Sequence, residues 1–437
     1  MERHKILLFS PKITSRLRYI ALHLVENILG TELVFTTDIE EARLAGIPLI
    51  NYTDSYMAGA VNIVPHGLLY EKNVCNQNID IERVNGKIVL FRSPGHDDTG
   101  FDLFAASFYM ISRYEEYLPG IKDEHGRFPF SGSLACRYSF ADEPVVDLWA
   151  AALRESIVRK YPAVYFPERE FTFIPTIDVD IPWAYKNRGL WRTAGGFARS
   201  ALKGDIDELI FRYRVLFNGR KDPFDTFRLI ETVHGENGLS PIFFFSAGTY
   251  GKFDKSVPVS HPAYSRLIDD LSSRYGWGIH PSWLSYNNSE LLKKETEMLT
   301  RITGEAPVRS RQHYLRLCLP DTYRYLSESG ISEDYTMGWA ETAGFRAGTC
   351  TPYMFYDLEG DEITGLKIFP FQIMDGSLCD YMKLPSPDAA EFACRIVEKV
   401  KDVNGTLVTL WHNESFSGTG RWKNWENVYL EIIRAAT

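Results

Sequence analysis

The chain has 437 residues, which is longer than one ordinary domain, so two domains are expected. It carries 48 Lys and Arg against 57 Asp and Glu. This net charge of −9 argues against a general nucleic-acid binder, which needs a positive field toward phosphate. No apolar segment is long enough to predict a membrane span, and the first residues show no secretory leader pattern. Six scattered cysteines without a Cys-x-x-Cys pair are typical of reduced thiols, so a cytoplasmic protein is expected.

Residues 1–165 predict a small α/β domain of unknown role. Strands are expected at 5–9, 33–36, 48–52, 61–64 and 87–91, and helices at 13–28, 37–46, 101–118 and 142–160. No glycine-rich phosphate loop follows the first strand, so nucleotide binding is not predicted. His96, Asp97, Asp98 and Asp102 could form a metal cluster. The preferred interpretation is an acidic turn in which Asp98 or Thr99 caps the next helix.

Residues 166–437 alternate apolar strands with helices. Beyond the strand that ends at residue 180, strands are expected at 241–245, 277–280, 308–314, 333–336, 344–348, 367–371 and 405–411. Helices are expected at 224–233, 261–275, 290–303, 321–330 and 388–400. This alternation predicts a parallel sheet, and over this length a barrel. Sites in such barrels lie at the carboxyl ends of the strands.

Polar residues stand at those strand ends. Asp178 and Asp180 are two positions apart on an extended backbone, so both carboxylates are expected on one face. Two such charges resist joint ionisation unless a cation or hydrogen bonds compensate them. The other polar residues at predicted strand ends are His280, Arg311, His313, Asp334 and His412. For a single histidine a buried, hydrogen-bonded core role is the simpler interpretation, but the convergence of the set predicts a site.

A basic helical insertion is predicted at residues 181–222. Between 181 and 221 it carries nine Lys and Arg against three acids, a local charge of +6, with aromatic residues interspersed. Two interpretations stay open. The segment is either a solvated basic face or a flap that receives a phosphate- or lipid-linked substrate over the site.

Five stretches resemble the motifs of the polysaccharide deacetylase family, carbohydrate esterase family four. They are Thr176-Ile177-Asp178-Val179-Asp180, Gly278-Ile279-His280, Arg311-Gln312-His313-Tyr314, Asp334 with Gly344-Phe345-Arg346-Ala347-Gly348, and Leu407-Val408-Thr409-Leu410-Trp411-His412. The resemblance covers residues 169–437. It implies a distorted (β/α)7 barrel that uses a divalent metal, such as zinc, cobalt or nickel, to remove acetyl groups from amino sugars. Residues 1–165 resemble a domain found ahead of this module in uncharacterised bacterial proteins.

The same resemblance implies roles for individual residues. Asp178 is expected to be the general base, Arg311 to orient it, and His412 to be the general acid. Asp180 and His280 are expected metal ligands. Substrate contacts are expected from Trp283, Tyr314, Arg346, Asp375, Leu410 and Trp411. A carbohydrate partner follows, in a polysaccharide or lipopolysaccharide precursor.

One position departs from the family pattern. Leu284 stands where the second motif has its other histidine, four residues after His280, and leucine cannot bind a metal. Catalytic zinc normally has three protein ligands, so either His313 or Asp334 supplies the third or the site is vacant. The alternative to a hydrolase is a catalytically degenerate barrel that binds a glycan or a protein. A glycosidase is disfavoured, because carboxylates two residues apart would lie on one side of the scissile bond.

Overall fold

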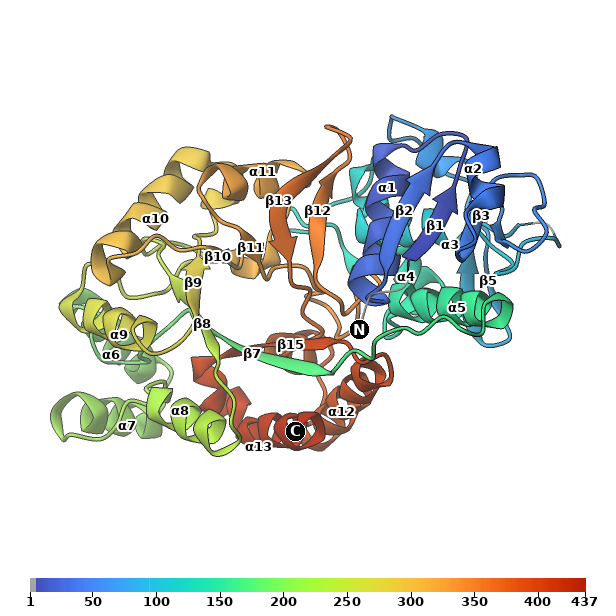
Figure 1. The fold of residues 1–437 in the computed structure, drawn as a ribbon. Helices are drawn as coiled ribbons and strands as arrows, with labels where there is room; N and C mark the ends of the chain where they lie inside the picture. The colour runs from blue at the N-terminus through green and yellow to red at the C-terminus, as the bar shows by residue number, and fades with distance from the viewer. Residues whose placement is uncertain (1–4, 94) are drawn as a thin grey trace. The chain divides into compact units, whose positions relative to one another are not determined.

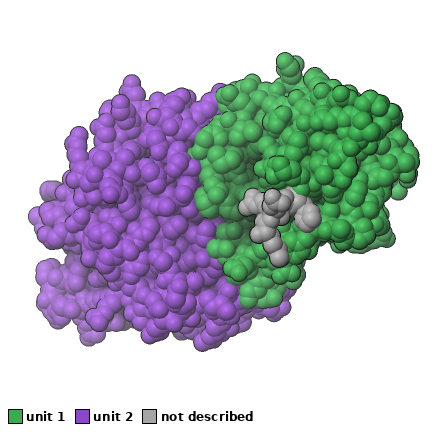
Figure 2. All heavy atoms as spheres, viewed as in Figure 1, with its two compact units in different colours: residues 1–172, 337–372, 398–407 green, residues 173–336, 373–397, 408–437 purple. Residues whose placement is uncertain are grey.

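The computed structural model describes residues 5–93 and 95–437. The chain forms two compact units (Figure 2): unit 1 comprises residues 1–172, 337–372 and 398–407, and unit 2 comprises 173–336, 373–397 and 408–437. The units therefore differ from the contiguous ranges 1–165 and 166–437, because two later segments belong to unit 1. Within the described ranges, no helix has the length and apolarity to cross a membrane.

Unit 1 is built on a sheet of four parallel strands in the order β2-β1-β3-β4 (Figure 1). The predicted first four strands are all present: β1 (Lys5–Phe9), β2 (Glu32–Thr36), β3 (Leu49–Tyr52) and β4 (Val61–Ile63). Two antiparallel pairs accompany them, β5 (Ile81–Val84) with β6 (Lys87–Leu90) and β12 (Tyr353–Asp357) with β13 (Glu362–Ile368). The helices are α1 (Ser15–Leu22), which continues as a π-helix (His23–Ile28), α2 (Ile39–Leu44), α3 (Leu103–Ile111), α4 (Leu134–Arg137) and α5 (Val145–Lys160).

The acidic group of unit 1 serves its turns. Asp97 accepts hydrogen bonds from the backbone N–H of Val64 and Thr99, and Asp98 pairs with Lys160. Asp102 caps α3 through the N–H of Ala105 and also accepts the hydroxyl of Tyr52. The structural interpretation of this group is therefore supported, although the capping residue is Asp102 rather than Asp98 or Thr99.

The strand predicted at 344–348 is absent, and the segment bends instead. Gly344 has φ 138°, and a Cβ there would lie 2.3 Å from the carbonyl oxygen of Ala141. Gly348 has φ 66°. Only glycine adopts such angles readily, so these residues mark a turn rather than a strand. The β12–β13 hairpin that follows was not predicted either.

Unit 2 contains seven strands in the order β11-β10-β9-β8-β7-β15-β14. They are β7 (Thr172–Val179), β8 (Ile242–Ser246), β9 (Trp277–His280), β10 (Arg309–Ser310), β11 (Glu333–Asp334), β14 (Ile373–Met374) and β15 (Thr406–His412). The registers that are defined between β7, β8, β9, β10 and β11, and between β14 and β15, are all parallel. Within the described residues no pairing of β11 with β14 closes this sheet. The fold is therefore mixed α/β, and the predicted distorted (β/α)7 barrel is not confirmed, because the described strands do not close into a barrel.

Helices surround these strands (Figure 1). From residue 173 on they are α6 (Leu190–Leu202), α7 (Ile206–Phe217), α8 (Phe227–Glu236), α9 (Pro262–Ser272), α10 (Ser289–Thr303), α11 (Asp321–Glu328), α12 (Ser386–Asp402) and α13 (Trp425–Ala436). The helical content predicted for 181–222 is present as α6 and α7. Helix α13 was not predicted. Its buried face nevertheless shows helical spacing, with Trp425, Val428, Tyr429 and Ile432.

Candidate metal and catalytic site

The strand registers of unit 2 bring the candidate residues to one edge. Val179 pairs with Phe245, Phe245 with Ile279, and Ile279 with Ser310. The next residue on three of these strands carries a site side chain: Asp180, His280 and Arg311. A close approach of β9 and β10 fixes this level, because a Cβ on Gly278 would lie 2.7 Å from the carbonyl oxygen of Arg309. The register therefore places these three residues at the same level of the sheet.

Three histidines surround the carboxylate of Asp180. The Nε2 atom of His280 lies 3.1 Å from Asp180 Oδ1. The Nε2 atoms of His313 and His412 lie 3.4 Å and 3.6 Å from Asp180 Oδ2. Asp178 Oδ2 is 3.9 Å from the same Nε2 of His280, so both aspartates share one face, as their spacing predicts.

Each histidine is held by its other ring nitrogen. Nδ1 of His280 lies 2.6 Å from the carbonyl oxygen of Arg311. Nδ1 of His313 lies 2.9 Å from Asp254 Oδ1, and Nδ1 of His412 lies 2.8 Å from Asp375 Oδ1. These partners accept hydrogen bonds, so each Nδ1 carries a proton and each Nε2 faces Asp180. This arrangement is the usual support of histidine metal ligands.

Asp180, His280 and His313 fit a divalent metal. Their ligand atoms all lie within 4.8 Å of one another. Among the residues that the structure describes, Asp180 Oδ1 is buried and makes no hydrogen bond of good geometry. Two imidazoles and one carboxylate are ligands that zinc accepts, and nitrogen and oxygen donors also suit cobalt and nickel. Leu284 is 60% exposed and lies outside this set.

Asp334 does not join the metal group. Its Oδ1 accepts the backbone N–H of Thr336, and its Oδ2 accepts the hydroxyls of Ser310 and Thr336. Burial raises the pKa of this carboxyl. Asp334 therefore fixes the turn after β11, and of the two candidates left open for a third ligand, His313 is the residue that lies with Asp180 and His280.

Arg311 orients Asp178. Its Nη1 donates to Asp178 Oδ1 at 2.7 Å and to the hydroxyl of Thr176 at 2.6 Å. Its Nε donates to the carbonyl oxygen of Tyr335 at 2.9 Å, and its guanidinium lies over the ring of Phe244. Arg311 and Asp178 are both fully buried, so their opposite charges compensate one another away from water.

The charges of the cluster shift its pKa values. Burial would raise the pKa of Asp180, but the charges and hydrogen bonds of His313 and His280 hold it well below its usual range. Burial would lower the pKa of His313, but Asp180 and Asp254 raise it to about 9. Burial would also lower the pKa of His412, and here Asp375 contributes most to raising it well above its usual value. Without a metal, the cluster is therefore stabilised as carboxylates paired with imidazolium groups.

Asp375 supports His412 from the neighbouring strand end. It is completely buried and accepts the backbone N–H of His412 at 2.8 Å in addition to its Nδ1–H. It also accepts the hydroxyl of Ser415. Both oxygens of Asp375 are therefore occupied by His412 and Ser415, and its contact with a substrate stays a prediction. Asp254, which holds His313, was not singled out from the sequence at all.

Strand β15 separates its two predicted pocket residues. Leu410 is two positions before His412 and shares its face, whereas Trp411 points to the other side. Trp411 is fully buried, with its ring 4.9 Å from Tyr429 and 6.4 Å from Trp425 of α13. Trp411 therefore belongs to the core between β15 and α13. Of the two residues, only Leu410 lies on the side of β15 that carries His412.

Tyr314 and Trp283 lie beside the cluster. Tyr314 and Leu315 have φ of 58° and 55°, a sharp turn that immediately follows His313. The ring of Tyr314 is 4.6 Å from that of His313. Trp283 stacks between Phe253 and the guanidinium of Arg316, and its backbone N–H donates to Asp254. Both residues thus adjoin the support of His313.

Arg346 belongs to unit 1 and is occupied there. Its Nη2 pairs with Glu116 at 2.7 Å, and its Nη1 donates to the carbonyl oxygen of Gly338. Burial would raise the pKa of Glu116, but Arg346 and Arg113 lower it to about 2. The predicted role of Arg346 in substrate binding is not supported by this buried ion pair.

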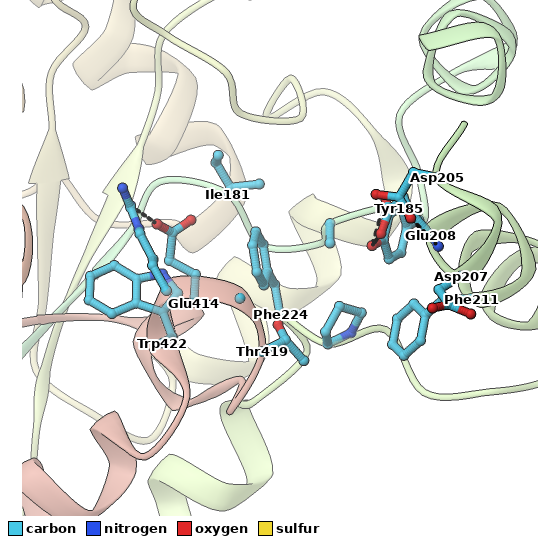
Figure 3. Close-up of a pocket in the computed structure, with 14 residues that line it drawn as sticks. Ile181, Tyr185, Asp205, Asp207, Glu208, Phe211, Phe224, Glu414, Thr419 and Trp422 are labelled. Carbon is cyan, nitrogen blue, oxygen red and sulfur yellow. Dashed lines mark hydrogen bonds and ion pairs between the residues drawn. The ribbon is translucent and has the colours of Figure 1, made fainter. Parts of the chain in front are cut away.

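A pocket of about 660 Å³ opens in unit 2 (Figure 3). Ile181, the residue after Asp180, and Glu414, two residues after His412, are among its lining residues. The figure shows Trp422 and Glu414 at one end and Tyr185, Asp205 and Glu208 at the other. The lining is Ile181, Ala184, Tyr185, Asp205, Asp207, Glu208, Phe211, Pro223, Phe224, Glu414, Thr419, Gly420, Arg421 and Trp422.

The lining of this pocket is acidic, whereas the insertion as a whole is basic. All three acids of residues 181–221 line it, whereas none of the nine bases of that segment does. With Glu414 it has four carboxylates against the single guanidinium of Arg421. A flap that attracts phosphate over a pocket would place bases there, so this lining does not support the expected phosphate- or lipid-linked substrate.

Comparisons with known proteins identify only part of the chain. Residues 6–162 match a family of unknown function, DUF7033. No curated protein matches the chain.

Several solved structures are similar to the chain. A protein from Mycobacterium smegmatis assigned as a polysaccharide deacetylase is 16% identical, with a TM-score of 0.40 over 62% of this chain and 85% of that one. The polysaccharide deacetylase Bc1974 from Bacillus cereus is 15% identical, with a TM-score of 0.28 over 61% and 87%. BA3943, a CE4 family pseudoenzyme from Bacillus anthracis, is 12% identical, with a TM-score of 0.28 over 59% and 60%. All three TM-scores are below 0.5, so this likeness assigns no activity.

Proposed function

We propose that the protein is a metal-dependent hydrolase that removes acetyl groups from an amino sugar of a polysaccharide or lipopolysaccharide precursor. The observation that carries the proposal is the group of three possible metal ligands, Asp180, His280 and His313. Two ion pairs lie beside this group: Asp178, the candidate base, with Arg311, and His412, the candidate acid, with Asp375. A ligand group flanked by candidate base and acid is the arrangement that metal-assisted amide hydrolysis needs.

Asp180, His280 and His313 would hold the metal. When bound, a divalent ion supplies Lewis acidity for the acetyl carbonyl and acidifies a bound water. Both imidazoles of this ligand group are positioned through their other ring nitrogen. Asp254 and the carbonyl of Arg311 hold the two imidazoles, so little reorganisation is needed on binding.

Asp178 is the general base of the proposed reaction. Arg311 donates to its Oδ1 at 2.7 Å, while Oδ2 faces His280 at 3.9 Å. Asp178 takes a proton from the attacking water, whose oxygen forms a bond to the acetyl carbon. Arg311 holds the carboxylate in that orientation and offsets its negative charge.

His412 is the general acid. Its Nδ1 proton is held by Asp375, so the proton that it transfers lies on Nε2, the atom that faces Asp180. This proton goes to the sugar nitrogen as the C–N bond breaks, which releases acetate and a free amine. Asp375 stabilises the charged imidazole before transfer and fixes its orientation throughout.

The pocket suits a sugar better than an anion. Trp422, Phe224 and Phe211 provide aromatic surface, and carboxylates are acceptors for sugar hydroxyls. A volume of about 660 Å³ lies within the usual range of small-molecule sites. An acetylated amino sugar is proposed from the motif resemblance together with this lining.

A second candidate function is a degenerate barrel that binds a glycan or a protein without hydrolysis. Leu284, at a position where the family motif has a histidine, favours it. The two functions differ in metal content, because a binding module needs no ligand group.

The test is elemental analysis of the purified full chain, followed by acetate release from acetylated amino sugars. We expect about one zinc, cobalt or nickel per chain in the wild type, and loss of metal in Asp180→Asn and His313→Gln. His96→Gln is the matched control, because His96 is an exposed histidine of unit 1. Asp178→Asn should retain metal and lose turnover.

Each alternative outcome points away from the hydrolase in a distinct way. No metal in the wild type, even after it is added back, favours the binding module. Metal without acetate release from any acetylated amino sugar would refute the substrate class. Normal turnover in both aspartate variants would show that the site is elsewhere.

A further inference from the structure

The outer faces of α6 and α7 expose an unusual density of large apolar side chains. Of the 22 exposed large hydrophobic residues in the described chain, seven lie between 190 and 217. Leu190, Trp191 and Leu202 are 88%, 92% and 89% exposed. The other four are Ile206, Ile210, Tyr213 and Phe217 of α7. Their spacing of four, three and four residues places them along one helix face, which an ordinary surface helix would bury.

The hairpin made by α6 and α7, residues 190–217, is anchored at its base. Asp222 accepts hydrogen bonds from the backbone N–H of Ala184, Tyr185 and Lys186. This one buried carboxylate therefore ties the segment that enters the hairpin to the segment that leaves it. The two ends of the hairpin are therefore held together.

The two helices are also joined on their inner side. Arg212 of α7 pairs with Glu208 and lies over the rings of Tyr185 and Phe197. It passes Gly196 of α6 so closely that a Cβ there would be 2.3 Å from its Nη1. The sides of α6 and α7 that face each other are therefore already packed through Arg212. The exposed apolar residues form a separate surface that faces away from this contact.

Exposed cations lie on the two helices and in the segments that follow each of them. The exposed bases are Arg199, Lys203, Arg214, Arg220 and Lys221. The three acids of the hairpin, Asp205, Asp207 and Glu208, line the pocket. Asp205 also caps α7, and Glu208 pairs with Arg212. Amphipathic helices with aromatic and aliphatic residues on one side and Lys and Arg beside them are typical of segments that lie in the interface of a charged membrane.

We propose that the α6–α7 hairpin docks the protein on the surface of an anionic lipid bilayer. The apolar stripe enters the boundary between headgroups and acyl chains, and the five cations contact the anionic headgroups. The hairpin lies in the plane of the interface and does not span the membrane. This inference stands independently of the proposed hydrolase. Since the hairpin begins at Leu190, a short segment after Asp180, docking would also tether the ligand group to the bilayer.

The test is flotation of the full-length protein with lipid vesicles. Vesicles of phosphatidylcholine mixed with phosphatidylglycerol are compared with vesicles of phosphatidylcholine alone, at low and high salt. We expect partition onto the anionic vesicles to be at least about tenfold stronger, and to weaken as salt screens the charges. Replacing two exposed apolar residues, Trp191→Ser with Phe217→Ser, should reduce it at least about tenfold.

Two further variants isolate the two contributions. Lys203→Glu with Lys221→Glu should remove the preference for anionic vesicles and its salt dependence. Ile121→Ser with Tyr165→Ser is the matched control, because it removes two equally exposed apolar residues outside the hairpin and should partition as the wild type. All of these side chains are exposed, so folding, checked by circular dichroism, should be unchanged.

Three results would overturn the proposal. The first is no partition of the wild type onto anionic vesicles. The second is equal partition by the apolar variant and its control. The third is a wild-type dimer in sedimentation that becomes monomeric in the apolar variant, since the face would then be covered by a second copy. Acetate release from a water-soluble acetylated sugar should not change in the hairpin variants, so failure of docking is distinguishable from failure of the hydrolase.

Discussion

Arg311→Met should strongly destabilise unit 2, and a second change should rescue it. The substitution leaves the carboxylate of Asp178 buried without its guanidinium partner. Removing one partner of a buried ion pair costs about 3–5 kcal/mol, because the remaining charge is uncompensated. Replacing both partners by apolar residues is often close to neutral. Arg311→Met combined with Asp178→Leu should therefore lie within about 1–2 kcal/mol of the wild type.

The expected shift is large enough for calorimetry. Unit 2 contains 164, 25 and 30 residues in its three segments, or 219 in all. For a unit of this size 1 kcal/mol corresponds to about 2–4 °C in Tm, so Arg311→Met should lower the transition of unit 2 by about 6–20 °C. The scans are run in chelator, so that metal binding does not contribute to stability.

Two results would refute this reasoning. One is a shift of less than about 2 °C in Arg311→Met, which would mean that the pair is solvated in the native protein. The other is a double variant as unstable as the single one. Stability would then depend on the contacts of Arg311 with Thr176, Tyr335 and Phe244 rather than on the charge that it compensates.

Three further predictions test the site and its surroundings. Asp375→Asn should retain metal but reduce acetate release about 10–100-fold, because His412 loses its charged partner; unchanged release would exclude this role. His23 and His234 have a pKa lowered to about 4 by burial, so the unfolded chain binds more protons between pH 4 and 6.5. Stability should therefore fall as pH drops through that window, by at most about 3 kcal/mol for each, and His234→Gln should flatten the slope in calorimetry. Leu284→His should leave metal affinity unchanged, measured by competition with a chelator, since that side chain is 60% exposed; a tighter metal site would contradict this geometry.

Sequence reasoning located the residues that strand ends position. Asp178 and Asp180 follow a buried strand at spacing two, and His280 and His412 are the last residues of β9 and β15. Alternation within a strand also indicates that Trp411 and His412 point to opposite faces, because they are one position apart. The motif resemblance predicts both Leu410 and Trp411 at the acetyl pocket, whereas the strand period puts only Leu410 on the face of His412.

Residues outside regular elements could not be located in this way. Asp254 lies in the long loop between β8 and α9, where no periodicity relates it to His313, 59 residues later. Asp375 follows a strand of only two residues, and its partner His412 is 37 residues away. Pairs of this kind depend on tertiary packing, which single-sequence patterns do not encode. Whether the sheet closes into a barrel could not be predicted for the same reason, because alternating strands and helices are compatible with both a barrel and an open sheet.

The environment of His313 explains how a ligand group can exist without a histidine at position 284. A structural core histidine has both ring nitrogens satisfied by neutral partners, as His234 has from Ile230 and Tyr429. His313 instead lies between two carboxylates, with Nδ1 on Asp254 and Nε2 toward Asp180. The two left-handed residues that follow it hold its turn at the strand edge, a conformation that costs of order 1 kcal/mol each and is usual at functional sites. The imidazole of His313 thus has a carboxylate near each ring nitrogen, an arrangement that also occurs around metal-ligating histidines and the groups that support them. Asp180 after β7, His280 of β9 and His313 after β10 are therefore three residues that could hold a metal ion, and three is the usual number of protein ligands at catalytic zinc.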